Sequence, residues 1–180
     1  MIYVFLAQGF EEVEALATVD VLRRAGLETK TVGVTGKTVS GSHSIPVVCD
    51  CEIGEISPDE SLEAVVLPGG MPGTLNLEKS AEVNKFIDYA AANDKYVCAI
   101  CAAPSILGKK GLLKGKEAIC FPGFEECLID AALSENSVVA DGKFITAKAC
   151  GVAIKFGKVI AEQFIGKVEA EKLWESLYND

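Results

Sequence analysis

The sequence predicts an α/β protein with an open, mainly parallel sheet covered by helices on both faces. Short apolar runs with the length of buried strands alternate along the chain with segments of helical periodicity. Hydrophobic residues make up 49 % of the 180 residues, which is enough for a core on both sides of a sheet. Because there is no repeat, low-complexity segment or linker, we expect a single domain over residues 1–180.

The first third of the chain predicts a βαβ unit followed by an excursion. Residues 2–7 are rich in β-branched and aromatic side chains and predict a strand buried on both faces. A helix is expected from Glu11, because acidic residues fill its first turn and apolar residues recur every three or four positions. Gly26 ends this helix, and 28–34 form the next strand. Turn signals between short extended pieces in 35–53 predict a small hairpin outside the main sheet.

The middle of the chain predicts two more buried strands. Residues 64–67 form the first, which ends in Pro-Gly-Gly. Residues 71–78 are expected to be a loop or a short helical turn, and 81–92 have the apolar stripe of an amphipathic helix. The apolar run 96–100 predicts the next strand, and Pro104 suits the first turn of the helix after it.

The last third predicts a hairpin and two helices. Residues 117–120 indicate a short strand, and 127–133 indicate a brief helical segment. An Asp-Gly pair between two β-prone runs predicts a hairpin over 138–146. Apolar residues at helical spacing predict a helix over 152–164, and a last helix is expected to reach about Tyr178.

The junction at Cys101 is the strongest candidate for chemistry. A strand that breaks into a helix at one nucleophilic side chain, with small residues such as Ala102 beside it, has the pattern of a nucleophile elbow. The start of the helix is expected to lower the pKa of the thiol and favour the thiolate. The alternative is a strand–helix junction that contains a structural cysteine, since free cysteines are often buried.

Three other residues are expected near Cys101, because the carboxyl ends of parallel strands share one edge of a sheet. A partly buried Glu14 would have a raised pKa and, when protonated, donate a hydrogen bond to the sulfur. The alternative is that the glutamates only complement the helix dipole. Backbone N–H groups of Gly70 and Ala102 are candidates for an oxyanion hole, and the alternative for them is turn geometry.

Composition excludes several classes of site and partner. A net charge of −9 argues against a nucleic-acid surface, and no apolar stretch is long enough to span a membrane. Residues 1–7 are interpreted as a strand and not as a signal peptide, so the seven cysteines are expected to be reduced, in the cytoplasm. Cys98 and Cys101 form one C-x-x-C, whose side chains should point to opposite faces of a strand. With no second pair and His43 as the sole histidine, no metal site and no cofactor are expected.

Four blocks of sequence resemble the ThiJ/PfpI superfamily, in the branch that contains the Parkinson-disease-associated deglycase. The blocks lie in the family's order, at 6–14, 19–26, 65–70 and 99–104, and 121–125 and 141–146 are similar to bacterial members, so the resemblance spans nearly the whole chain. The resemblance implies a flavodoxin-like, doubly wound three-layer sandwich, in a single domain of the class I glutamine amidotransferase-like type that forms a homodimer. It also implies that Cys101 is the reactive, oxidation-prone cysteine, that Glu14 is its protonated partner, and that Gly70 and Ala102 form the oxyanion hole.

Two departures from the family pattern alter the expected pocket. Phe121 stands where many relatives have a histidine, and 148–151, which include Cys150, replace an Arg-Gly-Pro-Gly segment. The remaining candidates for the pocket wall are Gly69, His43 and Arg24, and in a homodimer His43 and Arg24 are expected to reach the partner's pocket.

The resemblance implies a cofactor-independent glyoxalase or deglycase, of hydrolase or lyase type, that acts on small carbonyl compounds such as methylglyoxal or on their glycation adducts. Cys101 would be its nucleophile and Glu14 its proton shuttle. The alternative is an oxidative-stress sensor or redox-regulated chaperone that works through oxidation of Cys101. A cysteine peptidase or amidase is the third possibility, against which the lack of a well-placed histidine counts.

Overall fold

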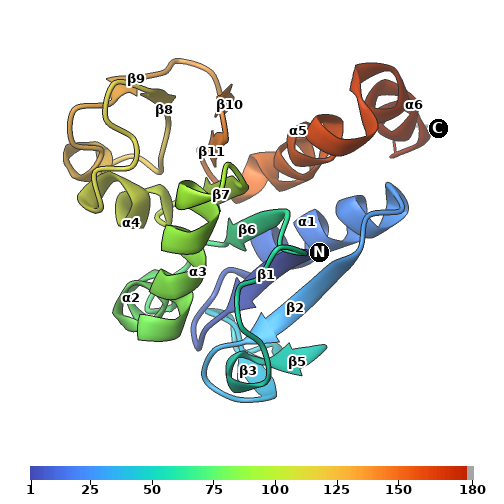
Figure 1. Cartoon of the computed structure of the whole chain (residues 1–180), viewed down its shortest axis with the longest axis vertical. Coiled ribbons are helices and arrows are strands. Elements are labelled where there is room, and N and C mark those ends of the chain that lie inside the picture. The colour runs from blue at the N-terminus through green and yellow to red at the C-terminus, as the bar shows by residue number, and fades with distance from the viewer. Residues whose placement is uncertain (178–180) are drawn as a thin grey trace.

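The computed structural model of the chain describes residues 1–177 and has a seven-stranded sheet at its centre (Figure 1). The strand order is β10-β11-β7-β6-β1-β2-β5. The strands of this sheet are β1 (Ile2–Leu6), β2 (Thr29–Gly33), β5 (Cys51–Glu52), β6 (Ala64–Leu67), β7 (Tyr96–Ile100), β10 (Val138–Asp141) and β11 (Phe144–Ala147). Every pairing is parallel except that of β10 with β11, so the expected α/β class is confirmed.

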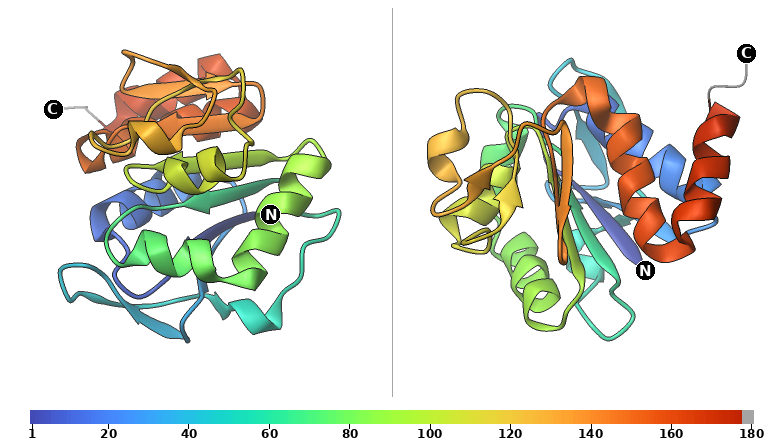
Figure 2. Two further views of the ribbon diagram at one scale, coloured as in Figure 1. Left: turned by 90° about the vertical axis from the view of Figure 1, so that its left-hand side faces the viewer. Right: turned by 90° about the horizontal axis from the view of Figure 1, so that it is seen from above.

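Helices cover both faces of the sheet and make a three-layer sandwich (Figure 2). One layer holds α1 and α5, with α6 packed on α5, and the opposite layer holds α2, α3 and α4. The helices are α1 (Glu12–Arg24), α2 (Gly73–Lys79), α3 (Ala81–Ala92), α4 (Pro104–Lys109), α5 (Ala153–Ile165) and α6 (Lys167–Leu177). Three short 3₁₀ turns lie at Ile53–Glu55, Glu125–Cys127 and Cys150–Val152.

Two apolar cores hold the layers together, one on each face of the sheet. Side chains alternate along each strand, so that in β1 Phe5 joins the core under α3 while Val4 and Leu6 join the core under α1 and α5. The aromatic rings of Phe5 and Phe86 lie with centroids 5.1 Å apart in the first core. This burial on both faces explains why the central strands are continuous apolar runs.

Strand β1 is the point where the order of the sheet reverses. Its register pairs Val4 with Thr31 of β2 on one side and with Val66 of β6 on the other. In open sheets of this kind, ligands bind at the carboxyl ends of the strands beside such a reversal. The topology therefore directs attention to the loops that follow β1, β6 and β7.

The excursion after β2 is a hairpin, as expected, formed by β3 (Thr38–Ser40) and β4 (Pro46–Val48). The 3-residue strands pair with each other and not with the main sheet. The sequence did not predict β5, the two-residue edge strand that follows, because two residues are too short to show a period.

Residues 113–137 depart most from the prediction. The expected helical segment 127–133 is wrong: the chain there has the end of a 3₁₀ turn and then β9 (Ala132–Leu133). The expected strand 117–120 is shortened to β8 (Glu117–Ala118), which pairs with β9 in a small separate sheet.

Two other expectations concern helices. Residues 71–78, expected to be a loop or a short helical turn, include most of the seven-residue helix α2 (Gly73–Lys79). The expected end of the last helix at Tyr178 lies outside the described residues.

No helix in the described part of the chain has the length and apolar character needed to cross a membrane.

Candidate functional site

Three loops meet at the carboxyl ends of the central strands. The first follows β1 and leads into α1, the second is Pro68-Gly69-Gly70 after β6, and the third is Cys101 and Ala102 after β7. Backbone hydrogen bonds join the first two, since the N–H of Glu11 donates to the carbonyl of Gly69 at 2.9 Å. Residues far apart in the sequence therefore share one small region of space.

Cys101 lies at a sharp turn between β7 and α4. Its φ of 64° falls in the left-handed region of the backbone, which residues other than glycine rarely adopt. Its N–H donates to the carbonyl of Ala147 at 2.9 Å. A strained residue between a strand and a helix is the geometry of a nucleophile elbow. Cys98, by contrast, is fully buried in the core under α1 and α5. Cys101 packs against the same core, so the expectation that the two side chains point to opposite faces is wrong, because the chain already turns at Cys101.

Glu14 lies against Cys101 and is almost completely buried, with 1 % of its surface exposed. Its Oε2 accepts a hydrogen bond of 2.8 Å from the N–H of Gly69. Its Oε1 has no regular hydrogen-bond partner within residues 1–177, although the carboxyl group interacts with the Cys101 sulfur. One carboxyl oxygen thus accepts a backbone hydrogen bond, and the other is available to carry a proton.

Burial has the largest effect on the pKa values of both Glu14 and Cys101. It raises the pKa of Glu14 to about 7, against the opposing effects of the Gly69 N–H and Cys101. Burial also raises the pKa of Cys101 to about 12, and the negative charge of an ionised Glu14 acts in the same direction. The N–H groups of Ala102 and Gly70 donate toward the sulfur and oppose these effects.

The expectation that the helix start lowers the thiol pKa is therefore wrong, because burial raises this pKa. Helix α4 has only six residues, so its dipole is small, and a buried carboxylate adjoins the sulfur. Protonation of Glu14 removes the effect of that charge and converts the carboxyl group into a hydrogen-bond donor, so its hydrogen bond then favours the thiolate. A neutral Glu14 therefore disfavours the thiolate less than an ionised Glu14 does, while burial continues to raise the thiol pKa.

Gly69 makes room for the contact between Glu14 and Cys101. A Cβ atom at Gly69 would lie 2.7 Å from the Cβ of Cys101 and 2.8 Å from Oε2 of Glu14. We expect Gly69→Ala to lower the free energy of unfolding by about 1–3 kcal/mol, because the two side chains must move apart. Chemical denaturation measures this loss.

Gly54→Ala is the matched control, since a Cβ there would meet no atom within 4 Å. It should leave stability within about 0.5 kcal/mol of the wild type. Equal stability of the two alanine variants would contradict the close packing described at Gly69.

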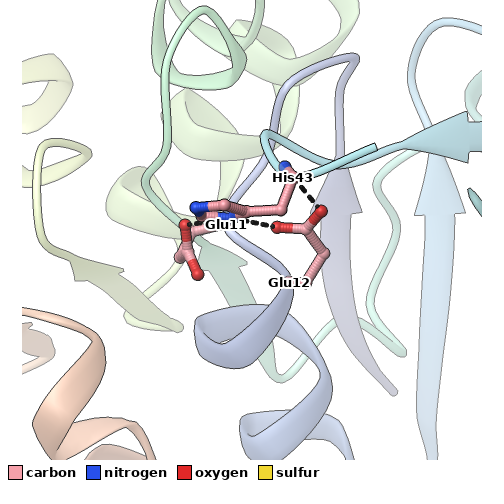
Figure 3. A group of neighbouring side chains, drawn as sticks. All are labelled: Glu11, Glu12 and His43. Carbon is pink, nitrogen blue, oxygen red and sulfur yellow. Dashed lines mark hydrogen bonds and ion pairs between the residues drawn. The ribbon is translucent and has the colours of Figure 1, made fainter. Parts of the chain in front are cut away.

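His43 binds to the beginning of α1 and not to the sulfur (Figure 3). Its Nδ1 lies 3.0 Å from Oε2 of Glu12, and its backbone N–H donates to Oε1 of Glu12 at 2.8 Å. Gly41 lets the hairpin close over this carboxylate, because a Cβ there would lie 2.1 Å from Cδ of Glu12. The hairpin thereby fixes the first turn of the helix that carries Glu14.

Glu12 is expected to contribute to stability in a way that depends on pH. Burial acts to raise its pKa, but hydrogen bonds from the His43 side chain and from backbone N–H groups outweigh burial and lower the pKa from 4.5 to about 2. The contribution is therefore present above pH 4.5 and is lost as the pH falls toward 2. We expect Glu12→Gln to destabilise the fold by about 1–3 kcal/mol at pH 7 and by less at pH 3.

Chemical denaturation of the two proteins across this pH range measures the difference. The exposed Glu126, changed to Gln, serves as the control and should show no such trend. A destabilisation by Glu12→Gln that stays constant between pH 7 and pH 3 would contradict the assignment.

Of the other expected pocket residues, Phe121 lies beside the elbow, whereas Arg24 lies far from it within one chain. Arg24 lies at the far end of α1, about 15 Å along the helix from Glu14, and pairs with Asp20 at 2.6 Å. Cys150 is exposed in a surface hollow beside Val13 of α1. Phe121 is adjacent to the elbow, since its N–H donates to the carbonyl of Cys101 at 2.8 Å, and 42 % of its surface is exposed.

Comparison with known proteins gives a consistent result. The model of the DJ-1/PfpI family matches residues 1–163. The chain is 32 % identical over 177 residues to the protein dj-1beta of Drosophila melanogaster, covering 97 % of this chain and 94 % of that one. It is 30 % identical over 154 residues to a deglycase of Pyrococcus abyssi, covering 83 % and 90 %.

Solved structures agree with these sequence matches. The structure of oxidized DJ-1 from Toxoplasma gondii has a TM-score of 0.93 and 31 % identity, and the match covers 98 % of this chain and 96 % of that one. The family resemblance stated from the sequence is thereby confirmed. With its elbow cysteine and three-layer sandwich, this chain belongs to the DJ-1/PfpI family.

Proposed function

We propose that the protein is a cysteine-dependent glyoxalase or deglycase that acts on 2-oxoaldehydes such as methylglyoxal, or on their glycation adducts. The observation that carries the proposal is the contact between Cys101 and a buried Glu14 whose pKa is raised to about 7. Such a carboxyl group can both give and take a proton near neutral pH. Membership of a family in which a relative is named a deglycase supports the same reading.

The proposed reaction starts with covalent capture of the substrate. The Cys101 thiolate forms a C–S bond with the aldehyde carbon of methylglyoxal, and the electron pair of the C=O bond moves to oxygen. The N–H groups of Gly70 and Ala102, which already point toward the sulfur, stabilise the oxyanion. Glu14 then supplies the proton that neutralises it.

The second stage moves hydrogen within the substrate. The ionised Glu14 removes the proton from the former aldehyde carbon to give an enediolate and returns this proton to the neighbouring carbon. The hydroxyl proton of the first carbon moves to the oxygen of the neighbouring carbon, which gives a thioester of lactate. Water cleaves this thioester, which releases lactate and restores the Cys101 thiolate. Overall, methylglyoxal and water become lactate; the aldehyde carbon is oxidised and the ketone carbon is reduced. The scheme includes no cofactor.

Production of lactate from methylglyoxal tests the proposal. Loss of methylglyoxal alone is insufficient, because the chain has seven cysteines that can trap aldehydes. The expected result is lactate in large excess over protein. Methylglyoxal consumption that stops at a few molecules per chain, without lactate, would refute the enzymatic role.

A second candidate function is oxidative-stress sensing or a redox-regulated chaperone role. The exposure and surroundings of Cys101 support it. Cys101 is partly exposed, whereas Cys49, Cys51, Cys98 and Cys120 are buried. The two N–H groups that point at the sulfur would also bind the oxygens of a sulfinic acid. Mass spectrometry after mild peroxide treatment should find oxidation at Cys101 first; equal oxidation at the exposed Cys150 would count against a sensor.

We also propose that the chain forms a homodimer through α1 and α5. Val13 and Ile154 expose 54 % and 42 % of their surfaces, and both line one surface hollow. Sedimentation of the wild type and of Val13→Asp tests this proposal: the wild type should be a dimer and the variant a monomer. A monomeric wild type would refute the proposed dimer.

A further inference from the structure

Four polar side-chain atoms converge where the β3–β4 hairpin meets the start of α1, and Figure 3 shows three of the residues that carry them, Glu11, Glu12 and His43. They are Oε2 of Glu11, Oε2 of Glu12, Oγ of Ser42 and Nδ1 of His43. The Ser42 oxygen lies 3.0 Å from Glu11, 3.2 Å from Glu12 and 3.1 Å from His43. The His43 nitrogen lies 3.0 Å from Glu12 and 3.5 Å from Glu11.

The number of protons in this cluster is smaller than the number of contacts. Five close contacts join the four atoms, but only the Ser42 hydroxyl and one His43 ring nitrogen can bring a hydrogen, and each brings one. The carboxylates of Glu11 and Glu12 accept and cannot donate. Most of the five contacts therefore lack a hydrogen of their own, while two negative groups face the same point. A bound cation would satisfy all of these atoms at once.

The spacing of the atoms fits a small tetrahedral ion. Ligands about 2.0 Å from Zn²⁺ in a tetrahedron lie about 3.3 Å from one another. The five separations of 3.0–3.5 Å in the cluster are close to that edge length, and one ligand atom from each of Glu11, Glu12 and His43 lies within 4.8 Å of the others. One imidazole and two carboxylates form a donor set suited to zinc and similar metals.

The surroundings hold the ligands in place and leave access from solvent. Backbone N–H groups of His43 and Ile45 donate to Oε1 of Glu12, which orients its Oε2 toward the cluster. The Glu12 side chain is 5 % exposed, whereas the His43 ring is 69 % exposed. An ion can therefore enter from the side of His43.

We propose that Glu11, Glu12 and His43 bind one divalent transition-metal ion of the Zn²⁺ type. The ion replaces the proton on Nδ1 of His43, which passes to solvent, and its charge compensates the two carboxylates. Ser42 or a water molecule completes the coordination. This site is separate from Cys101, so the proposal stands whether or not the protein turns over methylglyoxal.

Cobalt(II) is the probe for the test, because its spectrum distinguishes ligand types. The wild type should bind one equivalent of cobalt and show the intense visible absorption typical of four-coordinate cobalt. It should show no thiolate-to-cobalt charge-transfer band, which would exclude the cysteines as ligands. Glu11→Gln and His43→Ala should each weaken binding by about tenfold or more. Glu126→Gln is the control and should bind as the wild type does.

Three results would overturn the proposal. These are the absence of saturable binding, a thiolate charge-transfer band, and unchanged affinity in both ligand variants. Glu11 precedes α1 and His43 is on an exposed hairpin, so both variants should fold, and circular dichroism checks that they do.

Discussion

Cys101→Ser is expected to lower the rate of lactate formation from methylglyoxal by at least about 10³-fold. A serine hydroxyl at this position has nearly the size of the thiol but is far harder to ionise, and Glu14 next to it cannot act as a strong base while it retains its proton near pH 7. The capture step, in which the C–S bond forms, is then lost. The measurement is initial lactate production at saturating and at low methylglyoxal, which separates the loss in kcat from any change in KM.

Cys127→Ser is the matched control, since it removes another partly exposed thiol, which lies in the 3₁₀ turn Glu125–Cys127. It should retain the wild-type rate. Thermal unfolding of both variants should stay near that of the wild type, because neither change alters a fully buried side chain. Equal rates in the wild type and Cys101→Ser would show that lactate arises without this sulfur.

The sequence predicted the central architecture because the strands that build it are buried on both faces. The apolar runs in β1, β6 and β7 have a clear length and composition, and the acids at the start of α1 mark its first turn. The loops that follow these strands then meet by topology alone. For this reason the sequence alone predicts that Glu14, Gly69, Gly70 and Cys101 lie close together.

Features that depend on long-range packing were not predictable. The chain at 127–133 has an apolar pattern that fits a helix, but Ala132 and Leu133 pair with Glu117 and Ala118 across a loop. The thiol pKa was expected to fall because the sequence shows the helix start but not the depth of burial. The role of Gly69 was also missed, since only its distance to Glu14 and Cys101 shows why a side chain does not fit.

The hairpin residue His43 shows the same limit. A lone histidine between serines in a loop is usually solvated, and nothing nearby in the sequence indicates a partner. Its partners are Glu11 and Glu12, about 30 positions earlier in the chain. The glutamates that appeared to serve only the helix dipole therefore have a second set of contacts, which the fold alone brings to them.

Glu14→Gln is expected to lower lactate formation by about 10²–10⁴-fold and to change its pH dependence. In the wild type, a pH above about 7 ionises Glu14, and the new carboxylate disfavours the Cys101 thiolate and cannot donate a proton. The rate should therefore fall on the alkaline side. Glutamine does not titrate, so the residual rate of the variant should lack this descending limb, and rates measured from pH 5.5 to 8.5 provide the comparison.

Glu14→Gln should lose activity but gain stability relative to the wild type at high pH. The pKa of Glu14 is raised from 4.5 to about 7 in the folded state, so its proton stabilises the fold fully below pH 4.5 and this contribution, about 3 kcal/mol, is lost as the pH rises through 7. Glutamine still accepts the N–H of Gly69 and carries no charge. Denaturation at pH 5 and pH 8 should therefore show Glu14→Gln gaining stability relative to the wild type at the higher pH. A variant that is inactive but has the same pH dependence of stability as the wild type would mean that Glu14 is ionised throughout, and the proton transfers assigned to it would then have no donor.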